Sequence, residues 1–451
     1  MSASRKAALE KKWTSFRDER VRGDVENVPR ESLDGWQGFA ADILDFWEGV
    51  REGQVPERLN PALERSLRKG GVKGGARCAR MILTGTAGSG KSRTVRSCVQ
   101  ARKARARARC LQEQRQQGKS EEAACQAADD FAEDVVSLAA PTGCAAFQMK
   151  SGAATVHRVH GVPCGSIAQT SKEARKSERF LQRKHRLENA SLIGFDEFSM
   201  IGRQMLGKVL YRAAEIFPGS EPFPDRDCML SGDTRQAPPV VDEVLYKKGP
   251  YTGSKENRPK RENVEVPSLG SLVERANLFR ESFHDVVILQ EVHRVEREIA
   301  GLNAEEAARY RDEADRFLEV LGRLADLRWD PQKDWPFLQS RNRSILRRTP
   351  EGRRELEEFE DAPILVDTRK KGNAGIDGAL ELNLERLAQV AAKKKVPIAT
   401  CRAYHGYKGA RGDVKAQNID GDEFQGLPNE LHLCEGARVI LTHNEWVEAG
   451  S

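Results

Sequence analysis

The sequence has no apolar run near the roughly 18 residues that a membrane-spanning helix needs, which excludes such a span. Cysteine is sparse, with nine in 451 residues and no Cys-x-x-Cys pair. This usage excludes a small disulfide-stapled scaffold and argues against a structural zinc site. The first residues contain no hydrophobic segment of the kind found in secretory signals. We therefore expect an intracellular protein that is not secreted, keeps its thiols reduced and does not bind membranes.

The length and the charge balance set broad limits on organisation and partners. At roughly 100–200 residues per domain, 451 residues predict two to four domains. Lys and Arg number 74 against 68 Asp and Glu, a net charge of +6, which permits a nucleic-acid partner without requiring one. The run Ala101–Arg109 is basic, and we expect a solvated stretch of helix there in preference to a phosphate-binding patch.

Short apolar runs that do not alternate with polar residues predict buried parallel strands. They are Arg80–Thr84, Val135–Ala140, Ser191–Phe195, Cys228–Leu230 and Val286–Leu289. Helical patterns lie between them, at Ser92–Gln117 and Arg203–Ile216, and another precedes them at Trp36–Trp47. This order predicts a doubly wound α/β domain with helices on both faces of a parallel sheet.

The strongest motif fits G-x-x-x-x-G-K-[ST] and stands between a predicted strand and a predicted helix. Its residues are Gly85, Thr86, Ala87, Gly88, Ser89, Gly90, Lys91 and Ser92. Glycines allow backbone N–H groups to converge on phosphates. The Lys91 ammonium can reach the β- and γ-phosphates, and the Ser92 hydroxyl suits Mg²⁺. The motif predicts a nucleotide-binding P-loop.

Two adjacent acids, Asp196 and Glu197, follow a second predicted strand. At the carboxyl end of a neighbouring strand, Asp196 could hold Mg²⁺ and Glu197 could polarise an attacking water. Paired acids favour hydrolysis over phosphoryl transfer to a second substrate. Two solvated acids at a strand end are the alternative.

A third segment, Ser231–Val240, also follows an apolar strand. Its Gln236 could hydrogen-bond both a γ-phosphate oxygen and the lytic water. A rigid Gly-Asp turn followed by Pro-Pro is the alternative.

In this order, five segments resemble the PIF-type (petite integration frequency) DNA helicases, which belong to superfamily one and are related to RecD. The segments are Gly85–Ser92, Ala140–Ala146, Asp196–Met200, Gly232–Val240 and Leu289–Arg294. Thr155–His157 and Gly436–Leu441 also match. The resemblance spans residues 36–451.

The resemblance implies a domain organisation. After a polar lead-in at 1–35, a first RecA-like P-loop ATPase domain is expected at 36–300, with a small insertion at 160–190. A helical connection at 301–360 and an incomplete second RecA-like domain at 361–451 follow. Strand candidates in the last part are Pro363–Asp367 and Arg438–Thr442.

The resemblance also implies roles for individual residues. Lys91, Glu197, Gln236 and Arg294 would be catalytic, Arg294 as a cation that reaches the phosphates. Ser92 and Asp196 would hold Mg²⁺. The adenine of ATP would be read by Gln37. The DNA strand would contact Pro141, Thr142 and His157, although a packed imidazole is an alternative for His157.

The activity implied is ATP-driven 5′→3′ movement on single-stranded DNA, with unwinding of forked DNA, in repair, recombination or telomere maintenance. The nucleus or the mitochondrion would be the compartment. The last two motifs of the family, a His-Lys-x-x-Gly-type segment and a Ser-Arg segment, are missing, so a truncated chain is expected. A catalytically inactive remnant that binds nucleotide and nucleic acid is the alternative.

Overall fold

A computed structural model of the chain describes residues 27–51, 78–164, 167–217, 223–224, 226–252, 267–293, 303–359, 362, 378–402, 406–407, 410–411 and 430–439. The chain divides into two compact units, Met1–Arg328 and Trp329–Ser451. Among the described residues, no helix has both the length and the apolar character needed to cross a membrane.

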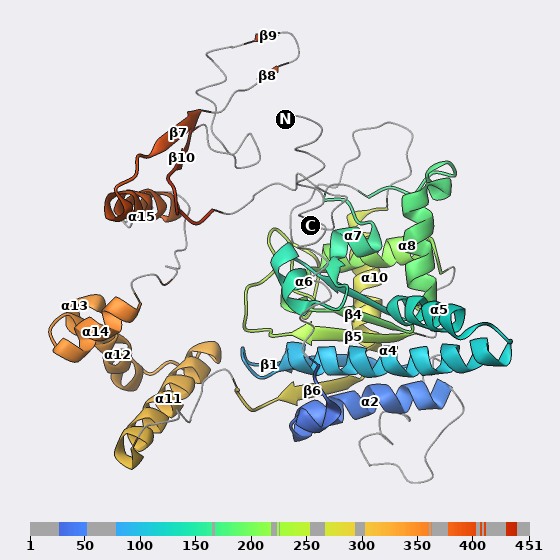
Figure 1. Cartoon of the computed structure of the whole chain (residues 1–451), viewed down its shortest axis with the longest axis horizontal. Coiled ribbons are helices and arrows are strands. Elements are labelled where there is room, and N and C mark those ends of the chain that lie inside the picture. The colour runs from blue at the N-terminus through green and yellow to red at the C-terminus, as the bar shows by residue number, and fades with distance from the viewer. Residues whose placement is uncertain are drawn as a thin grey trace. The chain divides into compact units, whose positions relative to one another are not determined.

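The first unit is built on a parallel sheet of six strands (Figure 1). The strands are β1 (Arg80–Gly85), β2 (Val136–Ala140), β3 (Ala154–Thr155), β4 (Leu192–Phe195), β5 (Asp227–Gly232) and β6 (Asp285–Leu289). Their spatial order is β3-β2-β4-β5-β1-β6, and each neighbouring pair is parallel. The five strands expected from apolar runs are confirmed. The two residues of β3 were missed because so short a strand has no apolar run.

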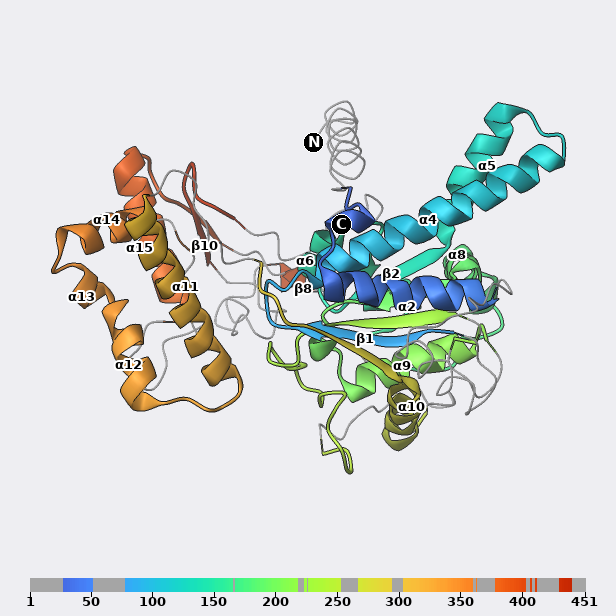
Figure 2. The ribbon, with the colours of Figure 1, turned by 90° about the horizontal axis from the view of Figure 1, so that it is seen from below.

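Helices cover both faces of this sheet, which confirms the α/β fold class. Helices α2 (Gly35–Arg51) and α4 (Lys91–Gln116) lie on one face, and α9 (Arg203–Ala214) and α10 (Leu269–Ser282) lie on the other (Figure 2). Helix α5 (Glu121–Asp134) packs against α4. The shorter helices are α6 (Gly143–Met149), α7 (Val156–His160) and α8 (Glu178–Asn189), with 3-10 turns at Arg30–Ser32, Ala174–Lys176 and Phe198–Met200.

The core explains why the strand runs do not alternate. One apolar cluster joins α2 and α4 to the sheet and contains Trp47, Met81 and Leu83, all nearly inaccessible. A second cluster fills the opposite face and contains Ile193 and Phe195. Since both faces are buried, successive residues of the central strands are apolar.

The described part of the segment at 160–190 packs on this domain, and its assignment as a small insertion stays a prediction. Ile167 and Leu187 are fully buried, and Leu187 belongs to the second apolar cluster. Arg226, just before β5, donates to the carbonyl oxygens of Leu187 (3.1 Å) and Glu188 (2.7 Å). Helix α8, which leads into β4, therefore contributes to the core of the domain through Leu187.

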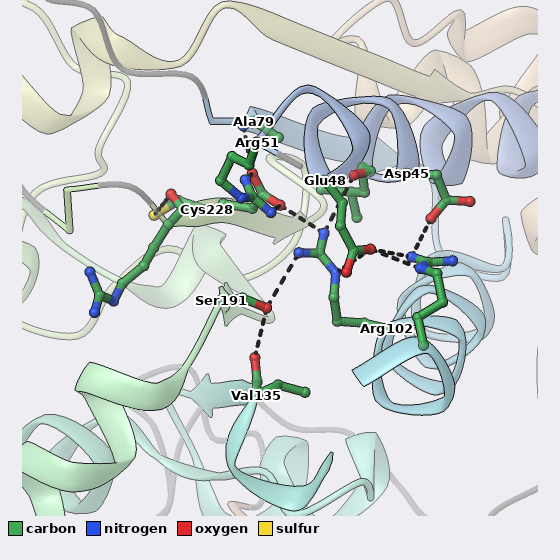
Figure 3. Close-up of polar contacts among 12 residues, drawn as sticks. Asp45, Glu48, Arg51, Ala79, Arg102, Val135, Ser191 and Cys228 are labelled. Atoms are coloured by element: carbon green, nitrogen blue, oxygen red, sulfur yellow. Dashed lines mark hydrogen bonds and ion pairs between the residues drawn. The ribbon is translucent and has the colours of Figure 1, made fainter. Parts of the chain in front are cut away.

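The basic run on α4 is not simply a solvated face, because Arg102 is only 1% exposed. Its guanidinium pairs with Glu48 of α2 at 3.1 Å and with Asp227 of β5 at 2.7 Å. Asp227 is inaccessible and also accepts from Arg51 and from the backbone N–H of Ala79. Figure 3 shows the Arg102 guanidinium between Glu48 and Ser191.

These charges hold α2, α4 and two strands together at the amino end of the sheet. Burial alone would raise the pKa of Asp227, but the charges of Arg102 and Arg51 outweigh burial and hold this pKa below its usual value. Other residues of the basic run also pair with carboxylates, Lys103 with Glu133 and Arg107 with Asp129. The run therefore serves as structural ion pairing, not as a phosphate-binding patch.

Replacing Arg102 with methionine should lower the free energy of unfolding by about 3–5 kcal/mol, because two buried carboxylates lose their shared cation. Urea denaturation measures the change. Arg107→Met is the matched control on the same helix, since its exposed pair should contribute much less to stability. Equal losses in the two variants would contradict a special role for the buried pair.

The first unit ends with helix α11 (Ala304–Ala325). The second unit begins with helices α12 (Pro331–Ser340), α13 (Arg343–Leu346) and α14 (Pro350–Glu358) and continues with short antiparallel pairs of strands. After α15 (Ala379–Lys394), β7 (Ala399–Arg402) pairs with β10 (Glu430–Leu433), and β8 (Gly406–Tyr407) pairs with β9 (Ala410–Arg411).

The second RecA-like domain therefore stays a prediction. The strand candidate at 363–367 lies outside the described residues. Arg438 and Val439, at the start of the other candidate, are not in a strand, and the rest of it is not described.

Candidate nucleotide-binding site

The parallel sheet brings the predicted site residues to one edge. The P-loop follows β1, Pro141 and Thr142 follow β2, and Asp196 and Glu197 follow β4. Gln236 stands in the turn after β5. Because the carboxyl ends of parallel strands share one edge, this is where an open α/β sheet binds its ligands.

The P-loop joins β1 to α4, and Lys91, the predicted catalytic lysine, is folded onto the loop. Gly90 precedes α4 with φ +84°, which a residue with a side chain adopts only under strain. The Lys91 ammonium donates to the carbonyl oxygens of Gly85 (2.7 Å) and Thr86 (3.0 Å) and is 8% exposed. Ser92 is partly exposed in the first turn of α4. These positions suit a lysine that can exchange the carbonyl acceptors of its own loop for phosphate oxygens.

Gln37 lies against the P-loop, as the resemblance implied for a residue of the nucleotide site. It is 2% exposed, and its Nε2 donates to the carbonyl oxygen of Ser89 at 3.2 Å. A Cβ on Gly90 would stand 2.3 Å from this Nε2, so only glycine permits the contact. Helix α2 thus carries Gln37 to the loop from 52 residues away in the sequence.

The acidic pair after β4 combines burial with backbone strain. Burial, and then the charge of Glu197, raise the pKa of Asp196 to about 6, while the Lys91 ammonium acts in the opposite direction. Glu197 has φ +49°, a left-handed conformation that is uncommon for a residue with a side chain. Its Oε2 is buried without a hydrogen-bond partner among the described residues. An uncompensated carboxylate oxygen of this kind is suited to accept a bond from a bound water.

The end of β5 supports the strained residue. A Cβ on Gly232 would lie 2.8 Å from the backbone nitrogen of Phe198 and 3.4 Å from the carbonyl carbon of Glu197. The absence of a side chain at Gly232 therefore lets the two strand ends approach. Beyond it, the backbone N–H of Gln236 bonds to Asp233 O at 3.0 Å, and the side chain of Gln236 is exposed.

The predicted DNA contacts stand on the other half of the same edge. Thr142 is partly buried, and its hydroxyl accepts from the N–H of Ala145 at the start of α6. Pro141, beside it, is also partly buried. The Nδ1 of His157 lies 2.8 Å from the carbonyl oxygen of Val162. Because a carbonyl only accepts, Nδ1 carries the proton, and Nε2 of the neutral ring is an acceptor that cannot donate to a phosphate.

The segment after β6 reaches the P-loop as well. The backbone N–H of His293 donates to the carbonyl oxygen of Gly88 at 2.8 Å, and its ring Nε2 lies 2.9 Å from Asp34 Oδ2. The sequence alone predicted no role for Asp34 or His293, since only the fold brings these two residues together. Arg294 lies outside the described residues.

A buried histidine, His160, lies against Phe195, the residue before the acidic pair, and the sequence alone did not predict its burial. Its ring stacks on Phe195 at 5.1 Å between centroids, and neither ring nitrogen has a partner among the described residues. Burial, and then the charges of Arg183 and Arg186, lower its pKa to about 3. His160 is therefore neutral in the folded protein.

His160 should make the domain sensitive to acid. Its folded pKa lies below the ordinary value of 6.5, so its contribution is complete above pH 6.5 and is lost as the pH falls toward 3. Between pH 7.5 and 5, the free energy of unfolding should fall by about 2 kcal/mol more in the wild type than in His160→Phe. Urea denaturation at both pH values measures this difference. Parallel pH profiles would contradict a buried neutral imidazole.

The fold and this edge of the sheet define a P-loop nucleoside-triphosphatase domain. In agreement, residues 70–242 match the family model described as an AAA domain, which covers less than half of the chain. No curated protein matches the sequence.

Several solved structures of Pif1 helicases are similar to the chain. Bacteroides Pif1 bound to ssDNA is 17% identical with a TM-score of 0.38, over 87% of this chain and 67% of that one. Pif1 helicase from Candida albicans is 15% identical with a TM-score of 0.41, over 84% and 63%. A Pif1 complex with forked dsDNA is 17% identical with a TM-score of 0.38, over 84% and 65%. The chain thus spans about two thirds of the length of these proteins.

Proposed function

We propose that the chain is an ATP-dependent DNA helicase, a DNA-stimulated ATPase that moves 5′→3′ on single-stranded DNA. The observation that carries the proposal is the convergence, at one edge of a parallel sheet, of the P-loop, the acidic pair, Gln236 and the Pro141–Thr142 segment. The AAA-domain match over residues 70–242 supports the ATPase part. The order of the motifs supports the helicase part.

In this proposal the loop residues Gly85–Ser92 bind the triphosphate through backbone N–H groups. Lys91 would leave the carbonyl oxygens of Gly85 and Thr86 and donate to phosphate oxygens. Glu197 would orient the attacking water with Oε2, which has no partner among the described residues, and Gln236 would contact the γ-phosphate. Arg294 would contribute a further cation.

The oxygen donors at the site fit Mg²⁺. The Ser92 hydroxyl and the Asp196 carboxylate are hard ligands of the kind this cation prefers. Burial and the charge of Glu197 raise the pKa of Asp196, and a bound cation would act against both effects. When bound, Mg²⁺ neutralises charge on the phosphates.

Single-stranded or forked DNA is the proposed partner, along the surface that includes Pro141, Thr142 and His157. A hydrogen bond donated by His157 Nε2 to a phosphate would require the doubly protonated ring, because Nδ1 already donates to the carbonyl oxygen of Val162. Genome maintenance, in repair, recombination or at telomeres, inside the nucleus or the mitochondrion, is the proposed setting.

A binding assay tests the DNA part of the proposal. The full chain is titrated against a fluorescent single-stranded oligonucleotide and a matched duplex at about 50 and 200 mM salt, with Mg²⁺ and a non-hydrolysable ATP analogue. We expect tighter binding to the single strand, weakening steeply with salt because phosphate contacts release counterions. Absence of single-strand binding at the lower salt would overturn the helicase proposal and favour a P-loop ATPase with another substrate.

A further inference from the structure

A pair of side chains outside the expected motif roles connects three segments of the nucleotide site. His293, after β6, donates its backbone N–H to Gly88 O of the P-loop and its ring lies 2.9 Å from Asp34 Oδ2. Asp34 directly precedes α2, whose third residue is Gln37. The P-loop, the start of α2 and the segment after β6 therefore meet at this pair.

Asp34 uses its two carboxylate oxygens for different purposes. Oδ1 accepts from the backbone N–H of Gln37 at 2.8 Å, the usual bond of a helix cap, while Oδ2 faces His293. The backbone N–H of Asp34 also lies 3.4 Å from Gln37 Oε1. Asp34 thus contacts both the backbone and the side-chain amide of Gln37.

These contacts assign the orientation of the Gln37 amide. Oε1 faces the N–H of Asp34, and Nε2 faces the carbonyl oxygen of Ser89, so the reverse orientation would place like groups together. The contact with Asp34 uses one lone pair of Oε1, and the contact with Ser89 uses one hydrogen of Nε2. One acceptor site and one donor site remain.

A donor beside an acceptor is the pattern that matches adenine, which presents the N7 acceptor next to the N6 amino donor. Guanine presents two acceptors, O6 and N7, on the corresponding edge. An amide held in one orientation therefore discriminates between the two bases, whereas an amide that turns over does so less well.

We propose that Asp34 and His293 are positioning residues that set the preference for adenine over guanine nucleotides: the bond between their side chains holds Asp34 in place, so that its backbone N–H stays against Gln37 Oε1 and fixes the orientation of the amide. This inference rests on the proposed function and on the role that the resemblance implies for Gln37, the reading of the adenine of ATP. The carboxylate of Glu291 lies within 4.8 Å of the same ligand atoms, but Glu291 and His293 are exposed. Since the His293 ring already bonds Asp34, we assign these two side chains a structural role, the support of Gln37, in place of metal binding.

Two substitutions separate this role from helix capping. Asp34→Ser keeps a good cap for α2 but is too short to reach the His293 ring. His293→Phe keeps the ring volume and the backbone bond to Gly88 but loses the bond to Asp34. Asp42→Ser is the matched control, because Asp42 is on the same helix and pairs with Arg30 at the surface.

The experiment measures the Kd values of ATP and GTP for the full chain by equilibrium binding with Mg²⁺. In both variants, and not in Asp42→Ser, we expect the ratio of the GTP Kd to the ATP Kd to fall about tenfold, with the GTP Kd unchanged. The double variant should lose no more than either single variant, because both changes break the same bond between Asp34 and His293.

The inference is overturned if the ratio stays at its wild-type value in His293→Phe and Asp34→Ser, or if both nucleotides weaken by the same factor. It is also overturned if the wild type binds ATP and GTP equally. A wild-type chain that binds neither nucleotide defeats the proposed function itself, so the two failures are distinguishable.

Discussion

Replacement of Glu197 by glutamine should reduce kcat for ATP hydrolysis by about 10³-fold, the usual contribution of a positioned general base. An amide of the same shape cannot accept a proton from the attacking water. The Kd for ATP should stay within about twofold of the wild-type value, since the proposed role concerns the water and not the nucleotide. Single-turnover hydrolysis and equilibrium binding together measure both quantities.

The matched control for this change is Glu188→Gln. Glu188 is an exposed acid on α8 that pairs with Lys184 and lies near the amino end of β4, away from the site edge. Its kcat should equal that of the wild type. A Glu197→Gln chain that hydrolyses ATP at the wild-type rate would contradict the role, and so would a loss of ATP binding as large as the loss of turnover.

Lys91→Ala should lower kcat/KM for ATP by about 10³-fold, because a cation aimed at the phosphates is worth several kcal/mol in the transition state. Unlike Glu197→Gln, this change should also weaken ATP binding. Loss of the two hydrogen bonds from Lys91 to the carbonyl oxygens of Gly85 and Thr86 should lower the free energy of unfolding by no more than about 1.5 kcal/mol per bond. ATP turnover and thermal unfolding of the same preparation separate the two effects.

Lys103→Ala serves as the control on the same helix. Lys103 pairs with Glu133 of α5 at 2.6 Å and has no part in the proposed phosphate site. Its turnover should be that of the wild type. ATP hydrolysis that continues at the wild-type rate in Lys91→Ala would contradict a catalytic role for the P-loop lysine.

The sequence was sufficient where local pattern and burial agree. The runs that became β1 and β4 do not alternate between apolar and polar residues because both faces of the sheet are covered, as the inaccessible Met81, Leu83 and Ile193 show. The P-loop could be predicted because its glycines serve the loop itself. Asp196 and Glu197 could be placed at the same edge, since parallel strands must end together.

The sequence was insufficient where two distant segments share one interaction. Arg102 stands in a basic run typical of a solvated helix, and only the packing of α2 on α4 shows that Glu48 and Asp227 enclose it. His160 has no local pattern that marks it as buried, and its stacking on Phe195 depends on the approach of α7 to β4. Asp34 and His293 are separated by 259 residues, so no spacing rule could pair them.

The backbone of Glu197 shows a third kind of limit. Its left-handed conformation and the close passage of Gly232 are three-dimensional consequences of two strands ending side by side. The residue type predicted a carboxylate at this position, but not that its Oε2 would be buried without a partner among the described residues.

The most direct test is the ATP turnover rate of the chain in Mg²⁺, measured with and without a single-stranded DNA oligonucleotide and compared with Glu197→Gln. A DNA-stimulated ATPase predicts that the oligonucleotide increases kcat in the wild type and that turnover in Glu197→Gln stays near background under both conditions. A wild-type rate that is the same with and without DNA, or a rate that is unchanged in Glu197→Gln, would contradict it.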